Sequence, residues 1–195
     1  MVFGLKKIQK KGGNLRGIKT LYKGTIFRSR LEAKWAAFFD FCKWKWEYEP
    51  FDLDGWIPDF ILMGVESILV EVKPYTSLKE FKETIKKIKK ATFKNRYRKK
   101  EILLLGCMIS LSRVWEGCGA IGWLGEIIDE DSPRRWYQEA DFNNYNGEAG
   151  FFPSYGCWKD RMTGLYDGDH FLMPESYEYV KRLFNKAGSK VQWKA

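Results

Sequence analysis

Two short apolar runs, each with an acidic residue inside it, constrain the fold of this chain more than any other feature. They are Ile57-Pro58-Asp59-Phe60-Ile61-Leu62 and Ile68-Leu69-Val70-Glu71-Val72-Lys73. Runs of this length and composition predict β-strands whose two faces are both buried. Burying a carboxylate in such a setting costs several kcal/mol unless a cation or strong hydrogen bonds compensate. Any fold of this chain must therefore supply a positive partner for Asp59 and Glu71.

The segment between the two runs, Met63-Gly64-Val65-Glu66, predicts a tight hairpin that joins them. With a three-residue loop over 64–66, Asp59 is expected directly opposite Glu71, with their Cβ atoms ~5 Å apart. Glu71 and Lys73 are two residues apart on one strand, so their side chains project from the same face. Carboxylates this close can share one small hard cation. Mg²⁺ is the natural candidate because it binds few carboxylates and completes its shell with water and substrate phosphate. The alternative is a salt bridge from Lys73 to both acids without a cation.

The sequence around the hairpin predicts the element order helix, strand, strand, strand, helix, strand, which is an α/β arrangement. Ser29 and Glu32 have the spacing of a capping box, and so do Ser77 and Glu80, so each pair is expected to open a helix. The second helix has an apolar stripe on one side and mostly lysine on the other. The predicted ranges are a helix at about 29–42, strands at 44–48, 56–62 and 67–73, the lysine-rich helix from Ser77, and a strand at 102–105 that ends at Gly106.

Composition divides the chain into three parts. Residues 1–26 are predicted to form a basic N-terminal arm, and residues 27–106 the α/β core. Residues 107–195 are predicted to form a Gly- and Trp-rich C-terminal extension packed on that core, and the sequence predicts no topology for it. Its one clear element is a final helix from Pro174 to about Ala187, with proline in its first turn and Gly188 beyond its end.

Positive charge is concentrated in the first half of the chain. The whole chain carries a formal charge of +9. Residues 1–106 hold 24 Lys and Arg against 12 Asp and Glu, a balance of +12, whereas residues 107–195 hold 10 against 13, a balance of −3. A polyanion is the expected partner of the first half, because Lys and Arg that neutralise phosphates release condensed counterions. The alternative is a solvated basic surface.

Cysteine usage and the lack of long apolar segments predict an intracellular, cytoplasmic protein. Four cysteines (42, 107, 118 and 157) are scattered without a C-x-x-C pair, and a chain of 195 residues does not need disulfides, so reduced thiols are expected. A metal site built from Cys107, Cys118, Cys157 and His170 is an alternative, although the spacing matches no familiar zinc pattern. No apolar run approaches the ~20 residues that span a bilayer, and the basic start lacks the apolar stretch of a secretory signal. No membrane association is expected.

Pro58-Asp59, followed after an eleven-residue gap by Glu71-Val72-Lys73, resembles the signature of the PD-(D/E)XK nuclease superfamily. The predicted element order over residues 27–106 is also similar to the core of that superfamily, a restriction-endonuclease-like fold. The stretch Arg-Ser-Arg-Leu-Glu-Ala-Lys-Trp at 28–35, followed by the Pro-Asp hairpin, is similar to phage and mobile-element nucleases, including transposon end-cleaving enzymes.

Carried over residue by residue, this resemblance implies a metal-dependent active site. Asp59 and Glu71 would ligate the metal, and the carbonyl of Val72 would add a ligand. Lys73 would orient or activate the attacking water. Many members also place a glutamate on the first helix near the metal, and Glu32 resembles that position; its alternative role is helix capping alone. Mg²⁺ is the implied cofactor, and Mn²⁺ is expected to substitute for it.

The function predicted on these grounds is a Mg²⁺-dependent DNA endonuclease. A bound metal lowers the pKa of a water molecule and stabilises charge on the scissile phosphate, and Lys73 adds electrostatic stabilisation. The alternatives are a nucleic-acid-binding protein of the same fold that does not cut, and an RNA endonuclease. Basic residues near the predicted site could hold phosphates, although each could instead be a solvated surface charge: Arg28, Arg30, Lys34, Lys82, Lys86 and Lys89. The sequence predicts no oligomeric state.

Overall fold

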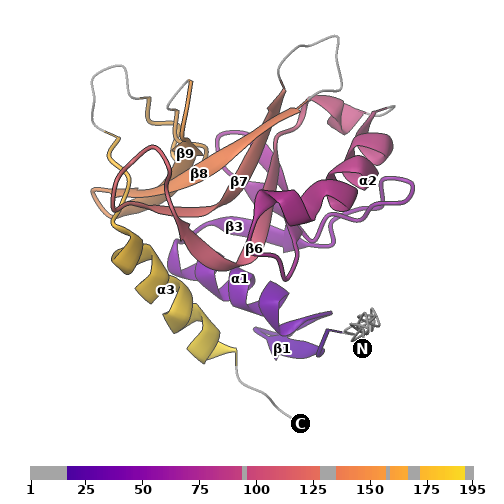
Figure 1. Ribbon diagram of the computed structural model, residues 1–195. Helices are drawn as coiled ribbons and strands as arrows, with labels where there is room; N and C mark the ends of the chain where they lie inside the picture. The colour runs from indigo at the N-terminus through magenta and orange to yellow at the C-terminus, as the bar shows by residue number, and fades with distance from the viewer. Residues whose placement is uncertain (1–16, 94–95, 128–134, 157–158, 167–171, 192–195) are drawn as a thin grey trace, which may run out of the picture.

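The computed structural model describes residues 17–93, 96–127, 135–156, 159–166 and 172–191. It is an α/β fold built on one curled seven-stranded sheet (Figure 1). In chain order, which is also the spatial order, the strands of this sheet are β3 (Lys45–Tyr48), β4 (Phe60–Met63), β5 (Ser67–Val72), β6 (Ile102–Leu111), β7 (Gly119–Ile127), β8 (Arg135–Tyr145) and β9 (Glu148–Pro153). Neighbouring strands are antiparallel except β5 and β6, which run parallel, so the sheet is mixed.

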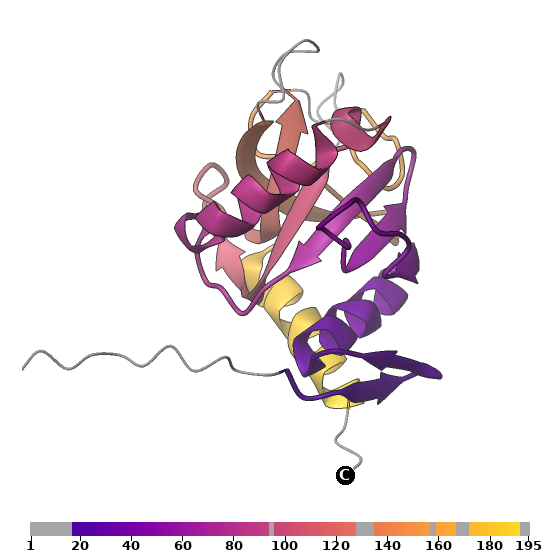
Figure 2. The same cartoon turned by 90° about the vertical axis from the view of Figure 1, so that its right-hand side faces the viewer.

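The helices lie on both faces of this sheet (Figure 2). Helix α1 (Arg30–Phe41) and helix α3 (Tyr177–Lys190) pack against each other and bury Trp35, Phe38 and Phe184 on one face. Helix α2 (Lys82–Thr92), preceded by the 3-10 turn η1 (Leu78–Phe81), buries Phe81 and Ile88 on the other face. A second short 3-10 turn, η2 (Arg96–Lys99), leads into β6. The sheet therefore has a hydrophobic core on each side, as a strand that is apolar on both faces requires.

The predicted hairpin and its register are confirmed. Phe60 pairs with Val70 and Met63 with Ser67, which leaves a three-residue loop over 64–66. Asp59 comes immediately before the first paired residue of β4, at the level of Glu71. The start of the strand was predicted wrongly, because residues 56–59 belong to the preceding loop rather than to β4. Pro58 has no amide hydrogen to contribute to a ladder, and the positive φ values of Asp54 (53°) and Gly55 (105°) turn the chain just before it.

The capping box predicted at Ser77 is present, whereas at Ser29 only half of the predicted box forms, because the Glu32 carboxylate accepts from the Ser29 hydroxyl and the Arg28 amide instead of the Ser29 amide. The Ser29 hydroxyl accepts a hydrogen bond from the Glu32 amide at 3.2 Å and begins α1 within one residue of the predicted start. At Ser77 the side chain and backbone of Ser77 and Glu80 are bonded reciprocally, but the first turn is 3-10 and the α-helix begins at Lys82. The strand predicted at 44–48 is β3, in which Trp46 and Tyr48 are half-buried while Lys45 and Glu47 alternate with them.

The second half of the chain extends the same sheet, which the sequence did not predict. The strand predicted to end at Gly106 continues to Leu111, so that end was wrong. Gly106 marks a close approach instead, because a Cβ there would lie 2.4 Å from the carbonyl oxygen of Tyr75. The register to β7 shifts between Leu105 and Ser110, and the strand runs on past this irregularity.

The last helix begins later and ends later than predicted. Ser176 caps it by accepting a hydrogen bond from the Tyr179 amide at 3.3 Å, so Pro174 lies before the helix and not in its first turn. Gly188, predicted beyond the end, lies inside the helix. A Cβ on Gly188 would approach the Lys34 side chain at 3.1 Å, so this glycine permits close packing against α1 instead of ending α3.

The two edges of the curled sheet come close to each other. The indole nitrogen of Trp44, just before β3, donates to the carbonyl of Ala149 on β9 at 2.8 Å. Between the edges, the Arg161 amide donates to Phe151 and the Arg161 carbonyl accepts from Val65, at 2.9 and 3.2 Å. Gly64 has no room for a side chain, since a Cβ would lie 2.1 Å from that carbonyl oxygen.

The N-terminal arm contains an element that the sequence analysis missed. Residues 1–16 lie outside the described part. Within the rest of the predicted arm, strand β1 (Thr20–Tyr22) pairs with β2 (Thr25–Phe27) in a separate two-stranded sheet next to α1. Lys23 and Gly24 form its turn with positive φ values of 46° and 82°, and Phe27 is fully buried. This hairpin fixes the direction from which the chain enters α1.

Candidate active site

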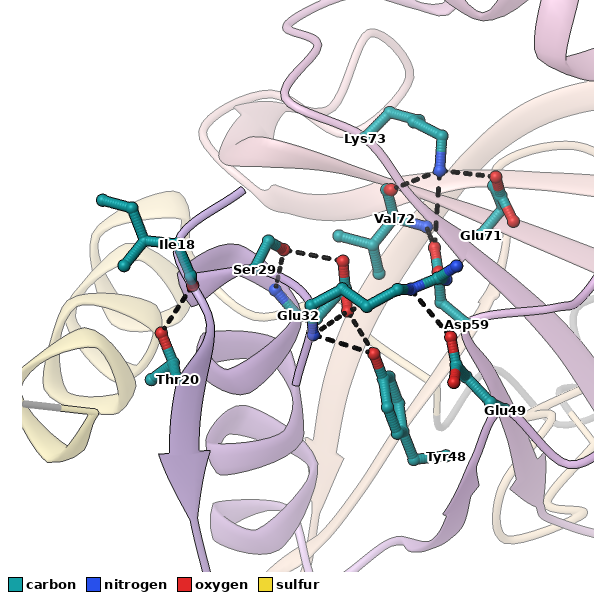
Figure 3. Close-up of polar contacts among 11 residues, drawn as sticks. Ile18, Thr20, Ser29, Glu32, Tyr48, Glu49, Asp59, Glu71, Val72 and Lys73 are labelled. Carbon is teal, nitrogen blue, oxygen red and sulfur yellow. Dashed lines mark hydrogen bonds and ion pairs between the residues drawn. The ribbon is translucent and has the colours of Figure 1, made fainter. Parts of the chain in front are cut away.

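Asp59, Glu71 and Lys73, predicted to act together, do come together at the end of the β4–β5 hairpin (Figure 3). The Lys73 ammonium lies 2.5 Å from Glu71 Oε1 and 3.6 Å from Asp59 Oδ2. It also donates to the Val72 carbonyl oxygen at 2.9 Å. Asp59 and Glu71 are 1% and 5% exposed, so both carboxylates are buried, and the Val72 amide donates to Asp59 Oδ2 at 2.7 Å.

Arg28 reaches one of these two carboxylates, Asp59, from the segment between β2 and α1. Its Nη2 lies 2.5 Å from Asp59 Oδ1 and its Nε lies 2.7 Å from Glu49 Oε1. The sequence analysis proposed Arg28 as a phosphate contact, and the structure shows a partner that was not foreseen. The Arg28 side chain is 52% exposed, so its ion pairs face water and can exchange for other anions.

Glu32 lies beside this group without touching Asp59 or Glu71. One of its oxygens accepts from the Ser29 hydroxyl at 2.7 Å, and the other accepts from the Tyr48 hydroxyl at 2.6 Å and from the Arg28 amide at 3.2 Å. These bonds serve the helix cap. Burial and the Glu32 charge raise the pKa of Tyr48, so Tyr48 remains a donor to Glu32. The Arg28 Nε lies 4.0 Å from Glu32 Oε2. Because Arg28 also pairs with Asp59, it connects Glu32 to the carboxylates of the site.

Trp56 is a site residue that sequence reasoning missed. Its indole nitrogen donates to Glu71 Oε2 at 2.7 Å, and both groups are buried. The sequence analysis included Trp56 only as the first residue of the strand predicted at 56–62. A signal was available, because a buried indole usually needs a hydrogen-bond acceptor and the neighbouring strand carries a carboxylate.

The electrostatic balance of the site leaves negative charge in excess. Burial, followed by the neighbouring Glu71 carboxylate, raises the pKa of Asp59, and Lys73 offsets part of the rise, so the pKa comes to about 7. Burial alone would lower the pKa of Lys73, but Asp59 and Glu71 outweigh it and hold that pKa above its usual value. The connected ion pairs join four carboxylates (Glu32, Glu49, Asp59 and Glu71) to two cations (Arg28 and Lys73), a formal charge of −2.

The donor set suits a hard divalent cation, although it is small. Mg²⁺ is commonly held by one or two carboxylates together with water and phosphate oxygens, and Asp59 and Glu71 supply two carboxylates next to the Val72 carbonyl. A charge of +2 would balance the excess at the site. Among the described residues, no group of three or more His, Cys, Asp or Glu side chains is arranged to hold a metal ion. A cation would therefore rest on Asp59 and Glu71 and would displace the contacts of Lys73 or Arg28 with them.

The carboxylates open into a cavity of about 420 Å³. One wall comes from the loop before β4 and the opposite wall from α2, and the lining residues are Arg28, Glu32, Asp52, Gly55, Trp56, Ile57, Asp59, Glu71, Lys73, Thr84 and Lys87. Lys87 was not among the predicted phosphate contacts. Lys82, Lys86 and Lys89, which were, are exposed on α2 but do not line the cavity.

Arg30 and Lys34 also lie away from the cavity. They line a groove between α1 and α3 together with Leu31, Asn185, Gly188 and Ser189. The Lys34 ammonium lies 3.4 Å from the centre of the Phe184 ring, and burial lowers the pKa of Lys34. Of the residues predicted to bind phosphate, the structure therefore brings only Arg28 to the carboxylates.

Cys42, Cys107 and Cys118 are free thiols, as expected, whereas Cys157 and His170 of the alternative metal site lie outside the described residues. Within the described ranges, no helix combines the length and apolar character needed to span a bilayer. Comparison of the chain with models of known protein families, with curated proteins and with solved structures gave no match.

Proposed function

We propose that this protein is a Mg²⁺-dependent nuclease of the PD-(D/E)XK type that hydrolyses phosphodiester bonds in DNA as an endonuclease. The observation that carries the proposal is the convergence of two buried carboxylates, Asp59 and Glu71, on Lys73 at the floor of an open cavity. A buried acid whose pKa is raised, as that of Asp59 is, and that lies beside a charged partner in a cleft is typical of a functional site. A structural ion pair alone needs neither the second carboxylate nor the cavity.

In the proposed mechanism, Asp59 and Glu71 would hold the Mg²⁺ ion, which when bound would supply Lewis-acid chemistry and lower the pKa of a water molecule. Lys73 is held by Glu71 and by the Val72 carbonyl, so its ammonium lies between the carboxylates and the cavity and can donate to a phosphate oxygen or to the attacking water. Arg28, half exposed at the cavity wall, can leave Asp59 and bind a phosphate group bidentately through two of its oxygens.

A second candidate is a nucleic-acid-binding protein that does not cut. It is favoured by the fact that all four oxygens of Asp59 and Glu71 already have a donor: Arg28 and Val72 for Asp59, and Lys73 and Trp56 for Glu71. Such a group can exist without a metal. This candidate predicts equal DNA binding with and without Mg²⁺ and no products.

The test is incubation of the full chain with labelled single-stranded, duplex and branched DNA and with RNA, in Mg²⁺, Mn²⁺, Ca²⁺ or EDTA. Cleavage is expected in Mg²⁺ and Mn²⁺, with binding but little turnover in Ca²⁺, whose larger shell positions water poorly. Asp59→Asn, Glu71→Gln and Lys73→Ala should each reduce cleavage by at least ~100-fold. Asp54→Asn is the matched control, since Asp54 is exposed in the loop that leads to Asp59.

The two candidates differ in whether DNA is cut in Mg²⁺, since the binding protein that does not cut gives no products. Undiminished cutting in EDTA, with tightly bound metal excluded, would remove the proposed metal site. Full activity in any one of the three variants would remove that residue from the mechanism. Cleavage of RNA but not DNA would keep the chemistry and change the substrate.

A further inference from the structure

The loop between β3 and β4 carries one side chain that reaches directly to a candidate metal ligand. Trp56 is 1% exposed and packs with Leu53, Leu69 and Phe81 in the core beneath α2. Its indole nitrogen donates to Glu71 Oε2 at 2.7 Å. An indole has a single N–H donor, so in this orientation its hydrogen-bonding capacity goes to Glu71.

The loop backbone is shaped to hold Trp56 in this orientation. The Leu53 amide donates to the Trp56 carbonyl at 2.9 Å, which closes a turn around Asp54 and Gly55, both of which have positive φ. Asp52, Gly55 and Ile57 of the same loop line the cavity. The chain therefore turns sharply, buries the indole under α2, and returns to Asp59 three residues later.

The two oxygens of Glu71 have unlike partners. Oε1 is bound by Lys73, whose side chain is 33% exposed and belongs to a flexible four-carbon stem. Oε2 is bound by Trp56, a rigid ring packed on all sides. Only the second contact fixes the plane of the carboxylate, and it leaves Oε1 as the oxygen turned toward Lys73. Hydrogen bonds from outer groups to metal-binding carboxylates set their orientation and commonly change metal affinity by ~10–100-fold.

We infer that Trp56 is a positioning residue: its indole N–H fixes the Glu71 carboxylate so that Oε1 is presented to a cation at the Asp59–Glu71 pair. Trp56 contacts neither cation nor substrate. This inference rests on the proposed function, because it concerns the affinity of the same metal site. It differs from a packing role, which would affect folding stability without changing cation affinity.

The test uses an unusually well-matched control in the same chain. Trp56→Phe removes the donor and keeps an aromatic ring in the core. Trp35→Phe makes the same change on α1, where a fully buried indole donates to the Gly106 carbonyl at 2.9 Å, away from the carboxylates. Both variants lose one buried hydrogen bond, so both should lower the melting temperature. Trp56→His returns a ring N–H at a similar distance from the backbone in a smaller side chain.

The principal measurement is Ca²⁺ binding to the full-length protein by calorimetry without nucleic acid. Trp56→Phe should raise the Ca²⁺ dissociation constant ~10-fold or more, whereas Trp35→Phe should leave it within about two-fold. Trp56→His should bind Ca²⁺ more tightly than Trp56→Phe even if it is less stable. In cleavage assays, Trp56→Phe should need more Mg²⁺ for half-maximal rate and recover most of the wild-type rate at saturation.

The outcomes separate this inference from the proposed function. If the wild-type protein binds Ca²⁺ and cuts DNA while Trp56→Phe and Trp35→Phe have equal Ca²⁺ affinity, the positioning role of Trp56 is refuted and the nuclease stands. If the wild-type protein binds no divalent cation, both are refuted. If Trp56→Phe does not fold, Trp56→His is compared with Trp35→Phe, and a Ca²⁺ affinity for Trp56→His that is ~10-fold or more below that of Trp35→Phe refutes the need for the ring N–H.

Discussion

Replacing Asp59 with Asn should make the protein more stable at about pH 8, although it removes a candidate catalytic group. Burial and the neighbouring Glu71 raise the pKa of Asp59 from 3.8 to about 7 in the folded chain. Between these two values the folded state holds a proton that the unfolded state has lost. The free energy of unfolding therefore falls as pH rises through this window, by ~1.4 kcal/mol per pH unit.

Summed over the whole pH window, the fall in the free energy of unfolding is at most ~4 kcal/mol. Asn carries no charge at any pH in this range, so the variant avoids the loss. It can keep the bond from the Val72 amide, but it turns an NH₂ toward Arg28 and gives up that ion pair. We therefore expect Asp59→Asn to be more stable than the wild type by ~1–3 kcal/mol at about pH 8, with the difference shrinking as pH falls and gone near pH 4.

The assay is urea denaturation in EDTA at a series of pH values between about 4 and 8.5, with Asp54→Asn as the control for the same substitution at an exposed position. The control should stay within ~0.5 kcal/mol of the wild type throughout. An Asp59→Asn variant that is less stable at every pH, or whose difference from the wild type does not change with pH, would show that the Asp59 carboxylate is not held in an unfavourable charged state.

Two further predictions concern the cavity wall and the closure of the sheet. Lys87→Ala should weaken DNA binding in Ca²⁺ and reduce the salt dependence of the affinity by about one phosphate contact, a slope change of ~0.9, because Lys87 lines the cavity with the carboxylates. Each of Lys82→Ala, Lys86→Ala and Lys89→Ala should have a smaller effect. The measurement is an anisotropy titration at several salt concentrations, and a Lys87→Ala variant that matches the wild type would exclude this contact. Gly64→Ala should lower the free energy of unfolding, measured by urea denaturation, by at least ~2 kcal/mol, because its Cβ would lie 2.1 Å from the Arg161 carbonyl oxygen that accepts from the Val65 amide. A variant as stable as the wild type would show that the 159–164 segment is free to move away from the hairpin.

The parts of the fold that the sequence predicted are those controlled by residues close together in the chain. The register of Phe60 with Val70 follows from the length of the loop at 64–66 and the two-residue period of a strand. The start of α1 follows from the Ser29 N-cap, whose hydroxyl bonds to the Glu32 amide three residues further along the chain. The meeting of Asp59, Glu71 and Lys73 needed only these local rules, so the centre of the site could be predicted without tertiary information.

Contacts between distant segments could not be predicted in this way. The pairing of β6 with β7 and of β7 with β8 depends on which apolar strand finds which neighbour, and irregular registers such as the shift between Leu105 and Ser110 obscure the two-residue alternation. The Arg28–Asp59 pair requires knowing that the chain before α1 passes over the end of β4. The lysines of α2 appeared equivalent in sequence, and only the packing of Ile88 and Phe81 against the sheet turns Lys87 to the cavity and Lys86 away from it.

The charge excess of the site separates what folding needs from what the proposed function needs. Arg28 and Lys73 could neutralise two carboxylates, yet they are connected to four, and the acid with the least contact with water, Asp59, is the one whose pKa is raised. Replacing a whole buried ion pair by well-packed hydrophobic groups of similar volume is often neutral or stabilising, so the fold has no evident need of the extra negative charge. A divalent cation at Asp59 and Glu71 would remove the excess without adding a side chain. Saturating Mg²⁺ should then stabilise the wild type more than Asp59→Asn, because binding to the folded state alone raises the free energy of unfolding.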